Sequence, residues 1–333
     1  MSIFLFCIFF LTLLLTFVLE KVADRLCLID YPVDRSAHLD PKPSGGGIVI
    51  VGTFLSCAYF FNFNGHIPDH TFHALLGTIP IAIVGLFDDL SHASLRLRLP
   101  VQFLAAFWVI YWFGAVPSID FSFAEIGNPW ILIFLGIVSV VWLLNLYNFM
   151  DGIDAIAAAE VLFVNTMSSI FAIQSGDMAL ALLSAALFAA SAGFLVWNWP
   201  PAKLFMGDVG SGSLGFILGV LALASMHSGT LTVWTWLILL GVFVVDSTVT
   251  LVVRFINKEK WHEGHSSHAY QNAARRWGSH ERVVISILLV NIVWLAPLSW
   301  LSFLFPKSGF YICFVALTPL VYLCVKLKAG MRY

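Results

Sequence analysis

The sequence PWILIFLGIVSVVWLLNLYNFMDGID, residues 129–154, decides the fold class. Its first part, residues 129–147, is a continuous apolar run in which polar residues do not alternate with apolar ones. Such a run is typical of a helix in lipid, because only helices and closed barrels satisfy every backbone hydrogen bond there. The run ends in a stripe of amides and carboxylates. The same pairing of an apolar span with a polar motif recurs along the chain.

The composition excludes an ordinary soluble globular protein. Hydrophobic residues make up 60% of the chain, charged residues only 11%, and the mean hydropathy is +0.91. Soluble domains carry about 25% charged residues. We therefore predict an all-α polytopic integral membrane protein, a single membrane domain over residues 1–333 with about eleven transmembrane helices. The predicted spans lie near residues 2–19, 47–63, 71–86, 101–116, 129–147, 158–173, 178–197, 212–227, 231–253, 283–304 and 309–325.

Basic residues are strongly biased toward one side of the predicted membrane. If residues 20–46 are cytoplasmic and the spans alternate, every Lys and Arg except Lys307 falls inside. Positive residues collect in cytoplasmic loops, so we expect the N-terminus outside. The first span should stay as a membrane helix, because no basic segment or cleavage site marks it as a signal. The predicted cytoplasmic loops are residues 20–46, 87–100, 148–157, 198–211 and 254–282.

The net charge of −2 hides this basic inner face. Such a face suits the anionic headgroups of membrane lipids or a phosphorylated substrate, and nothing in the sequence favours a nucleic-acid partner. The five cysteines are scattered and form no CxxC pair, which favours reduced packing residues over a disulfide or zinc framework.

Two adjacent carboxylates, Asp88 and Asp89, follow the predicted third span. Neighbouring negative charges at a membrane boundary repel each other, and they are costly to desolvate unless a cation or a donor stabilises them. A metal–phosphate complex would provide that stabilisation. A helix cap is the alternative, but a cap accounts for only one of the two carboxylates.

Polar residues recur every three positions at Asn145, Asn148, Asp151 and Asp154, so a helix would present them as one stripe. Amides and carboxylates together can read the edge of a base, or they can hold hydroxyl groups and metal-bound water. A capping box is the alternative, although it requires fewer polar residues than this stripe contains.

Two further carboxylates have different predicted roles. Asp208, in the sequence Phe-Met-Gly-Asp, lies just before a span, where a lone oxygen ligand suits Mg²⁺ that also binds substrate phosphates. An N-cap is the alternative for Asp208. Asp246 falls within the predicted ninth span, and we interpret it as a hydrogen-bond partner of a neighbouring helix rather than a catalytic group.

Two polar loops carry cations or imidazoles. The first holds Arg35, His38 and Lys42 before three glycines, which would let backbone N–H groups approach a phosphate. An ordinary helix start explains this loop equally well. The last loop holds His265 and His268, three positions apart. We interpret them as phosphate donors, because imidazole spacing without a cysteine is weak support for zinc.

Taken together, Asp88-Asp89, Asn148-x-x-Asp151-Gly-x-Asp154, Phe205-Met-Gly-Asp208 and His265-x-x-His268-Ala-Tyr-Gln resemble the motifs of the polyprenyl-phosphate N-acetylhexosamine-1-phosphate transferases. The resemblance covers residues 35–271 in the same motif order, and the last motif is similar to that of the O-antigen-initiating branch. It implies transfer of a sugar 1-phosphate from a UDP-N-acetyl sugar to undecaprenyl phosphate, with release of UMP. It also implies Mg²⁺, with Mn²⁺ as an alternative, and a site on the cytoplasmic face of a bacterial inner membrane. A homodimer stays open.

The resemblance and the residue patterns together assign the site residues. Asp208 and Asp151 resemble metal ligands, and Asp88 and Asp89 resemble an acidic pair that deprotonates or orients the lipid phosphate, so these four are the expected catalytic residues. The expected substrate-binding residues are His38, Lys42, Asn145, Asn148, Asp154, Asn198, Phe205, His265 and His268. Among these, Asp154, Asn198 and Phe205 resemble a uridine-binding set, and the two histidines resemble pyrophosphate contacts.

Three positions depart from the resemblance. Related sequences commonly carry Arg where this chain has Ser44 and Ser266, and Gly where it has Ala155. Two missing guanidiniums would weaken diphosphate binding, so a catalytically impaired family member acting as a scaffold is the main alternative to an enzyme. A transporter or an intramembrane aspartyl protease is disfavoured, because Asp151 and Asp208 lie at span boundaries rather than within spans.

Overall fold

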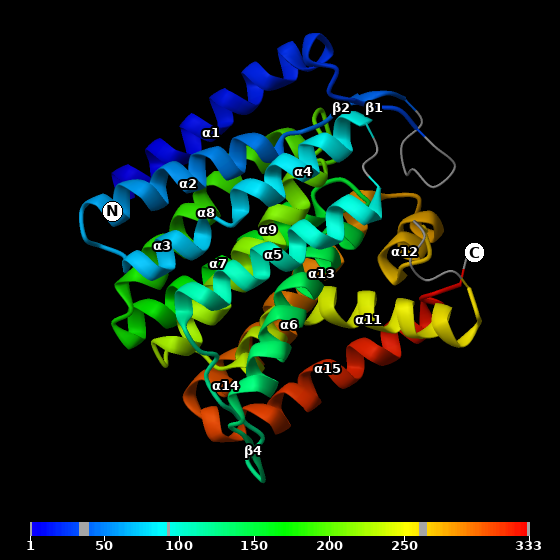
Figure 1. Cartoon of the computed structure of the whole chain (residues 1–333). Helices are drawn as coiled ribbons and strands as arrows, with labels where there is room; N and C mark the ends of the chain where they lie inside the picture. Colours follow the sequence, from blue (N-terminus) through cyan, green and yellow to red (C-terminus); the bar gives the residue numbers. More distant parts are fainter. Residues whose placement is uncertain (1, 33–39, 92–93, 260–264, 332–333) are drawn as a thin grey trace.

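The computed structural model describes residues 2–32, 40–91, 94–259 and 265–331, which are almost entirely helical (Figure 1). The first helices are α1 Ser2–Val22, α2 Gly47–Phe63, α3 Asp69–Leu75, α4 Thr78–Ser91, α5 Leu95–Phe113, α6 Pro129–Met150, α7 Ile156–Ser175 and α8 Met178–Asn198. They are followed by α9 Asp208–His227, α10 Val233–Leu239, α11 Gly241–Ile256, α12 Ala269–Trp277, α13 His280–Val290, α14 Ala296–Leu304 and α15 Gly309–Lys326. Short 3-10 turns cover Ala23–Leu26 and Pro306–Ser308, and a π-helical turn covers Asn291–Leu295.

Each of the eleven predicted spans coincides with a helix or a broken helix. Within the described ranges, however, only eight helices are long and apolar enough to cross a membrane, and the bent pair α10–α11 would make a ninth. The apolar α2 is shorter, with 17 residues, and α5 carries two charged residues, Arg96 and Arg98, in its first turn. The prediction of an all-helical, multi-pass membrane protein is therefore confirmed, while length and composition support eight or nine spans instead of eleven.

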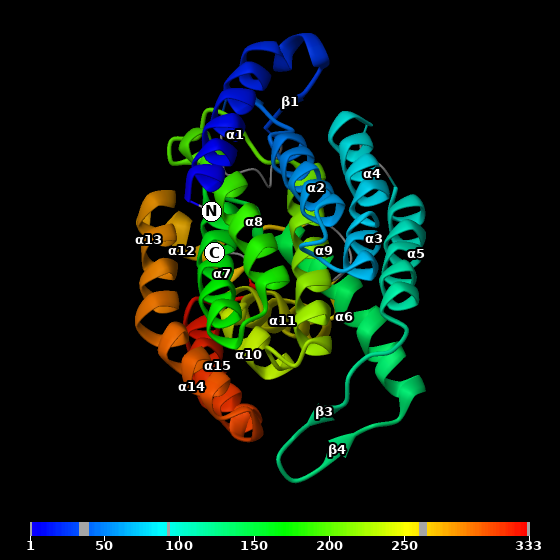
Figure 2. The same ribbon diagram turned by 90° about the vertical axis from the view of Figure 1, so that its left-hand side faces the viewer.

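The centre of the bundle is formed by α7, α8 and α9, as the view in Figure 2 shows. The most apolar stretch of α9 is 83% buried, whereas that of α1 is only 17% buried. Glycines let neighbouring helices approach α9 closely, because a Cβ at Gly85 would lie 2.7 Å from the Val209 Cα, and one at Gly215 would lie 2.5 Å from the Leu143 carbonyl oxygen. This packing places the ends of α4 and α6 beside the start of α9.

The helices α10 and α11 are bent by 83° relative to each other. As a result, α11 leaves the direction of the bundle and runs beside α15 (Figure 1). The predicted span over residues 231–253 is therefore two helices that meet at Leu240.

Two short antiparallel strand pairs lie at opposite ends of the bundle (Figure 2). Strand β1 Ile29–Asp30 pairs with β2 Lys42–Pro43 between α1 and α2. Strand β3 Ile119–Asp120 pairs with β4 Glu125–Ile126 between α5 and α6. Lys42 itself lies in β2, at the end of the bundle where the predicted site residues meet.

Candidate active site

The N-terminus of α9 is capped by a carboxylate from another helix. Asp89, in the last turn of α4, accepts hydrogen bonds from the backbone N–H groups of Asp208 at 2.7 Å and of Val209 at 3.1 Å. The first N–H groups of a helix lack partners within the helix and carry partial positive charge, so a carboxylate is favourable there. The close approach permitted by Gly85 makes this contact feasible. Asp89 therefore sets the position of Asp208.

Arg98 connects the other member of the acidic pair to Asp208. Its guanidinium contacts Asp88, and its Nη1 lies 3.2 Å from Asp208 Oδ2. The repulsion expected of adjacent carboxylates is thus relieved in two ways, by a cation at Asp88 and by backbone donors at Asp89. The sequence places Arg98 only among the basic residues of the inner face. Its position at the start of a helix beside an acidic pair is the signal that could have identified it.

Asn148 brings the end of α6 to the same place. Its Nδ2 donates to Asp208 Oδ1 at 2.7 Å and lies 3.2 Å from Ser211 Oγ. Both oxygens of the Asp208 carboxylate therefore have protein partners, from α5 on one side and α6 on the other. The carboxylate is still partly exposed, with 34% of the side chain accessible.

Asp151 follows directly as the C-terminal cap residue of α6. Burial raises the pKa of the Asp151 carboxyl well above its ordinary value, and the negative charges of Asp208, Asp89 and Asp154 raise it further. Because Asp151 is close enough to Asp89 and Asp208 for their charges to raise its pKa, it belongs to the same acidic cluster. We use that name below for Asp88, Asp89, Asp151 and Asp208.

Two loops lie next to the acidic cluster, one around Pro43 and Gly46 and the other around Ala202 and Phe205. The Phe205 N–H donates to the Pro43 carbonyl at 2.8 Å, and the Gly46 N–H donates to the Phe205 carbonyl at 2.9 Å. The Lys42 ammonium donates to the Ala202 carbonyl at 2.9 Å and lies 5.4 Å from the centre of the Phe205 ring. Lys42 and Phe205, predicted separately from two distant motifs, are therefore neighbours.

Asp154 and Asn198 connect the start of α7 with the loop that contains Ala202 and Phe205. Asp154 Oδ2 accepts the Ala202 N–H at 3.0 Å and lies 3.4 Å from His280 Nδ1. Burial alone would raise the pKa of the Asp154 carboxyl, but the hydrogen bonds from His280 and Ala202 outweigh it and the pKa is lowered. Asn198 accepts the Ala155 N–H at 2.9 Å. Both side chains are buried and already hold protein partners, and His280 is a neighbour that sequence reasoning missed.

Asn145 lies outside the acidic cluster. It exchanges two hydrogen bonds with Gln102 of α5, at 2.7 and 3.3 Å, and it also donates to the Val141 carbonyl at 2.8 Å. Such an amide pair links two helices in a membrane. Residues of the predicted polar stripe therefore have different partners. Asn145 takes part in a contact between two helices, and Asn148 binds Asp208.

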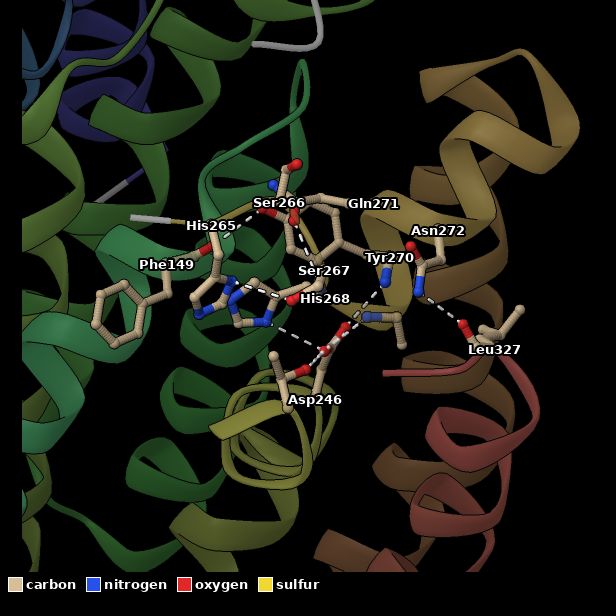
Figure 3. A network of polar contacts seen from close by, with 12 residues as sticks. Phe149, Asp246, His265, Ser266, Ser267, His268, Tyr270, Gln271, Asn272 and Leu327 are labelled. Carbon is tan, nitrogen blue, oxygen red and sulfur yellow. Dashed lines mark hydrogen bonds and ion pairs between the residues drawn. The ribbon is translucent and has the colours of Figure 1, made fainter. Parts of the chain in front are cut away.

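Figure 3 shows the contacts of the histidine segment, residues 265–268. Asp246 accepts hydrogen bonds from His268 Nδ1 at 3.2 Å and from the N–H groups of Ala269 and Tyr270, each at 2.9 Å. The interpretation of Asp246 as a partner of a neighbouring helix is confirmed, because it caps the N-terminus of α12. The rings of His265 and His268 stack with their centres 4.9 Å apart.

Tyr270 places the histidine segment beside the end of α6. Its hydroxyl donates to the Phe149 carbonyl at 2.9 Å, and Gly152 leaves the room for it, because a Cβ there would lie 2.2 Å from the Tyr270 oxygen. The structure thus brings together the acidic cluster, the two loops and the histidine segment. His38 lies outside the described residues. Ser44 and Ser266, the two positions where the resemblance implies Arg, are both buried.

The acidic cluster has the donor chemistry of a magnesium site. Mg²⁺ takes oxygen ligands and commonly binds one or two carboxylates together with substrate phosphates and water. Asp208 and Asp151 repel each other, which a divalent cation would reverse. Over residues 2–32, 40–91, 94–259 and 265–331, no three His, Cys, Asp or Glu side chains form a metal-binding group. The arrangement suits an ion that completes its coordination with water and phosphate.

Fold and site together define a multi-pass helical membrane protein with an acidic polar site at one end of the bundle. The sequence model described as glycosyl transferase family 4 matches residues 71–226, which include the whole acidic cluster. A probable undecaprenyl-phosphate N-acetylglucosaminyl 1-phosphate transferase of Bacillus subtilis is 26% identical, over 84% of this chain and 79% of the relative. An undecaprenyl-phosphate alpha-N-acetylglucosaminyl 1-phosphate transferase of Thermotoga maritima is 28% identical, over 87% and 89%.

A third relative, a phospho-N-acetylmuramoyl-pentapeptide-transferase of Streptococcus thermophilus, is 30% identical over 67% of this chain and 69% of its own length. The chain belongs to glycosyl transferase family 4, a family of polyprenyl-phosphate sugar-1-phosphate transferases. The resemblance predicted from the four motifs is therefore confirmed.

Proposed function

We propose that this protein transfers an N-acetylhexosamine 1-phosphate from a UDP-sugar to undecaprenyl phosphate and releases UMP. The observation that carries the proposal is the convergence of Asp89, Asp151 and Asp208 with Arg98 at the N-terminus of α9. The names of the relatives from Bacillus subtilis and Thermotoga maritima support N-acetylglucosamine as the sugar. The product would initiate O-antigen or another cell-envelope polysaccharide.

In the proposed reaction, an oxygen of the lipid phosphate attacks the β-phosphorus of the UDP-sugar. The new phosphorus–oxygen bond forms as the bond between the β-phosphorus and the bridging oxygen breaks, and UMP leaves with that oxygen. Phosphoryl transfer of this kind depends on positioning and charge neutralisation more than on covalent help from the protein. A Mg²⁺ ion held by Asp208 and Asp151 would neutralise charge on the diphosphate.

On the acceptor side, we assign Asp88 and Arg98 to the lipid phosphate. Arg98 already contacts Asp88 and Asp208, so a phosphate that approaches it arrives next to the proposed metal ligands. Asp88 would accept the phosphate proton or align the phosphate through this guanidinium. Asp89 holds Asp208 in place and does not need to touch either substrate.

On the donor side, the two neighbouring loops and the histidine segment provide complementary groups. Phe205 offers an aromatic face for uracil, with the Lys42 ammonium next to it. Asp154 and Asn198 shape this loop through their backbone contacts. His265, which is half-buried, would donate to the diphosphate. His268 is 1% exposed and binds Asp246 through Nδ1, so it would support His265 through the stacked rings.

The decisive test is an assay of purified protein in detergent. Undecaprenyl phosphate is supplied with each of several UDP-N-acetyl sugars, and UMP is measured with Mg²⁺, with Mn²⁺ or with a chelator. We expect metal-dependent UMP release that is largest with UDP-N-acetylglucosamine. A protein that binds UDP yet releases no UMP from any sugar would support a scaffold instead, an outcome that the buried Ser44 and Ser266 would then explain.

A further inference from the structure

We infer that the C-terminal segment, residues 327–331, is a positioning element for the histidine segment. This inference rests on the proposed function, in which His265, supported by the stacked ring of His268, contacts the donor diphosphate. The C-terminal segment follows the last residue of α15, with Gly330 close to Val253 of α11 and Leu327 bound to Asn272 of α12 (Figure 1). It is connected to the histidine segment by two sets of hydrogen bonds, one indirect through Asn272 and Arg275 and one direct from Gly330.

The first set is centred on Asn272 of α12, whose side chain is only 1% exposed. Its Nδ2 lies 2.9 Å from the carbonyl oxygens of Leu327 and Lys328 and 3.1 Å from that of Met331. Figure 3 shows the contact with Leu327. The last carbonyls of a helix lack partners within the helix, so this amide binds the chain as it leaves α15.

The same amide is connected to the histidine segment through Arg275. Asn272 Oδ1 accepts a hydrogen bond from Arg275 Nη2 at 2.6 Å, and Arg275 Nη2 also donates to the Ser266 carbonyl. Asn272 is therefore the link between the C-terminal segment on one side and the backbone at Ser266 on the other.

The second set is a direct backbone contact. The Gly330 N–H donates to the Ser267 carbonyl at 2.8 Å. Gly330 has a φ of +81°, and a Cβ there would lie 2.7 Å from the Val253 Cβ. A side chain at this position would therefore be strained and would push the segment away from α11. Ser267 lies between the two histidines, so this bond acts at the centre of the histidine segment.

These contacts matter because residues 265–268 have no regular secondary structure of their own. Asp246 binds the histidine segment at one end, at His268, where the chain enters α12. The carbonyls of Ser266 and Ser267 are held by Arg275 and Gly330. Binding groups on a loop need such a supporting layer to keep a productive geometry. Loss of the C-terminal contacts should therefore weaken donor binding.

The test is Asn272→Asp in the full-length protein. Aspartate keeps the shape and can still accept from Arg275, but it has no N–H to donate and places negative charge against the three carbonyls. We expect the KM for UDP-N-acetylglucosamine and the Kd for UDP to rise about tenfold, the size of effect that follows from losing a buried hydrogen-bond partner. The kcat and the KM for undecaprenyl phosphate should change less than about twofold.

A second variant and a matched control make the test independent of one substitution. Gly330→Ala should raise the KM for the donor in the same way. Gly229→Ala introduces the same kind of backbone strain, because Gly229 has a φ of +74°, but a Cβ there meets nothing within 4 Å. Gly229→Ala should leave donor binding unchanged. Hydrogen exchange of the amides of residues 265–268 should accelerate in Asn272→Asp and Gly330→Ala only.

The outcomes separate this inference from the proposed function. If both variants lose thermal stability but keep the wild-type KM for the donor and the wild-type exchange rates, the segment is only a structural support and the inference is wrong. If wild-type protein neither binds UDP nor releases UMP, the proposed function fails. The exchange measurement then still decides whether residues 327–331 position the histidine segment.

Discussion

The carboxylate of Asp89 accepts the backbone N–H of Asp208 at 2.7 Å, although the two residues are 119 positions apart in the chain. Asp89 thereby fixes the start of α9, the helix that begins with Asp208. The same arrangement recurs where Asp246 caps α12. At both places, residues proposed to bind substrate or metal are held by a carboxylate that itself serves as a helix cap.

Asp89→Asn should reduce both stability and turnover. The asparagine oxygen can accept one of the two N–H groups of α9, but the Nδ2 would face the other donor. We expect a loss of about 1–2 kcal/mol in the free energy of unfolding, measured in detergent, and a clear decrease in UMP release because Asp208 is no longer fixed. The control is Asp177→Asn, since Asp177 caps α8 through the Leu180 N–H. If the control lowered turnover equally, the effect would be general destabilisation.

Asp208→Asn should abolish most of the activity while the protein still folds. Asparagine keeps the size of the side chain but removes the charge that we assign to metal binding. Removing one electrostatic group from a site of this kind typically lowers kcat by about two to three orders of magnitude. UMP release and the elution profile in detergent are measured together, with Glu125→Gln in the distant β4 strand as control. Near-normal Mg²⁺-dependent turnover of Asp208→Asn would refute the assignment.

The apparent affinity for Mg²⁺ should increase with pH. The pKa of the Asp151 carboxyl is raised by burial and by neighbouring carboxylates, so this group holds a proton at pH values where an ordinary aspartate is ionised. Mg²⁺ must displace that proton, so binding tightens as the pH rises and levels off above the raised pKa. Mg²⁺ titrations of UMP release at several pH values check this. Asp151→Asn should bind Mg²⁺ more weakly and lose the pH dependence; an unchanged dependence would implicate another group.

Ala155→Gly should be tolerated better than Ala158→Gly. Both alanines are fully buried near the start of α7, so each substitution removes a similar methyl group and adds the same freedom to the unfolded chain. Only Ala155 has a positive φ, of 67°, a conformation that strains an L-residue by about 1–2 kcal/mol. Ala155→Gly should therefore be more stable than Ala158→Gly by about that amount, measured by thermal unfolding. Equal stabilities would mean that the strain is relieved elsewhere.

The site should face the cytoplasm. We replace the native cysteines by serine and introduce single cysteines at Ser94, between α4 and α5, and at Glu125, in the hairpin at the other end. A membrane-impermeant maleimide applied to intact cells should label Glu125→Cys but not Ser94→Cys, and both should react after lysis. The reverse pattern would refute the orientation that the bias of basic residues predicts.

The helical membrane fold could be predicted from the sequence, because a continuous apolar run has few alternatives in a bilayer. The ends of helices were less predictable. Asp88 and Asp89 lie within the last turns of α4 rather than after it, and α12 forms in a loop that has no long apolar run. At the 83° bend between α10 and α11, α10 packs against α14 and α15 and α11 packs against α15. No local sequence pattern encodes these contacts.

The sequence also predicted several residues that lie together at the start of α9, but it did not predict their partners. Amides and carboxylates in separate motifs identified Asn148, Asp151 and Asp208. Sequence could not show that Asn145 pairs with Gln102, because two residues of the same stripe look alike until neighbouring helices are placed. Nor could it show that Arg98 joins Asp88 to Asp208. Contacts between residues distant in the chain depend on the tertiary arrangement.

Both helix caps at the site have a consequence for the order of biosynthesis. Asp89 precedes α9 in the chain and Asp246 precedes α12, so each of these helices emerges from the ribosome after the carboxylate that caps it. Asn272 is in the opposite situation, because its carbonyl partners, Leu327, Lys328 and Met331, are made after it. The acidic cluster can therefore be complete before α12 has been made, whereas the histidine segment gains its final support only after residues 327–331 have been made.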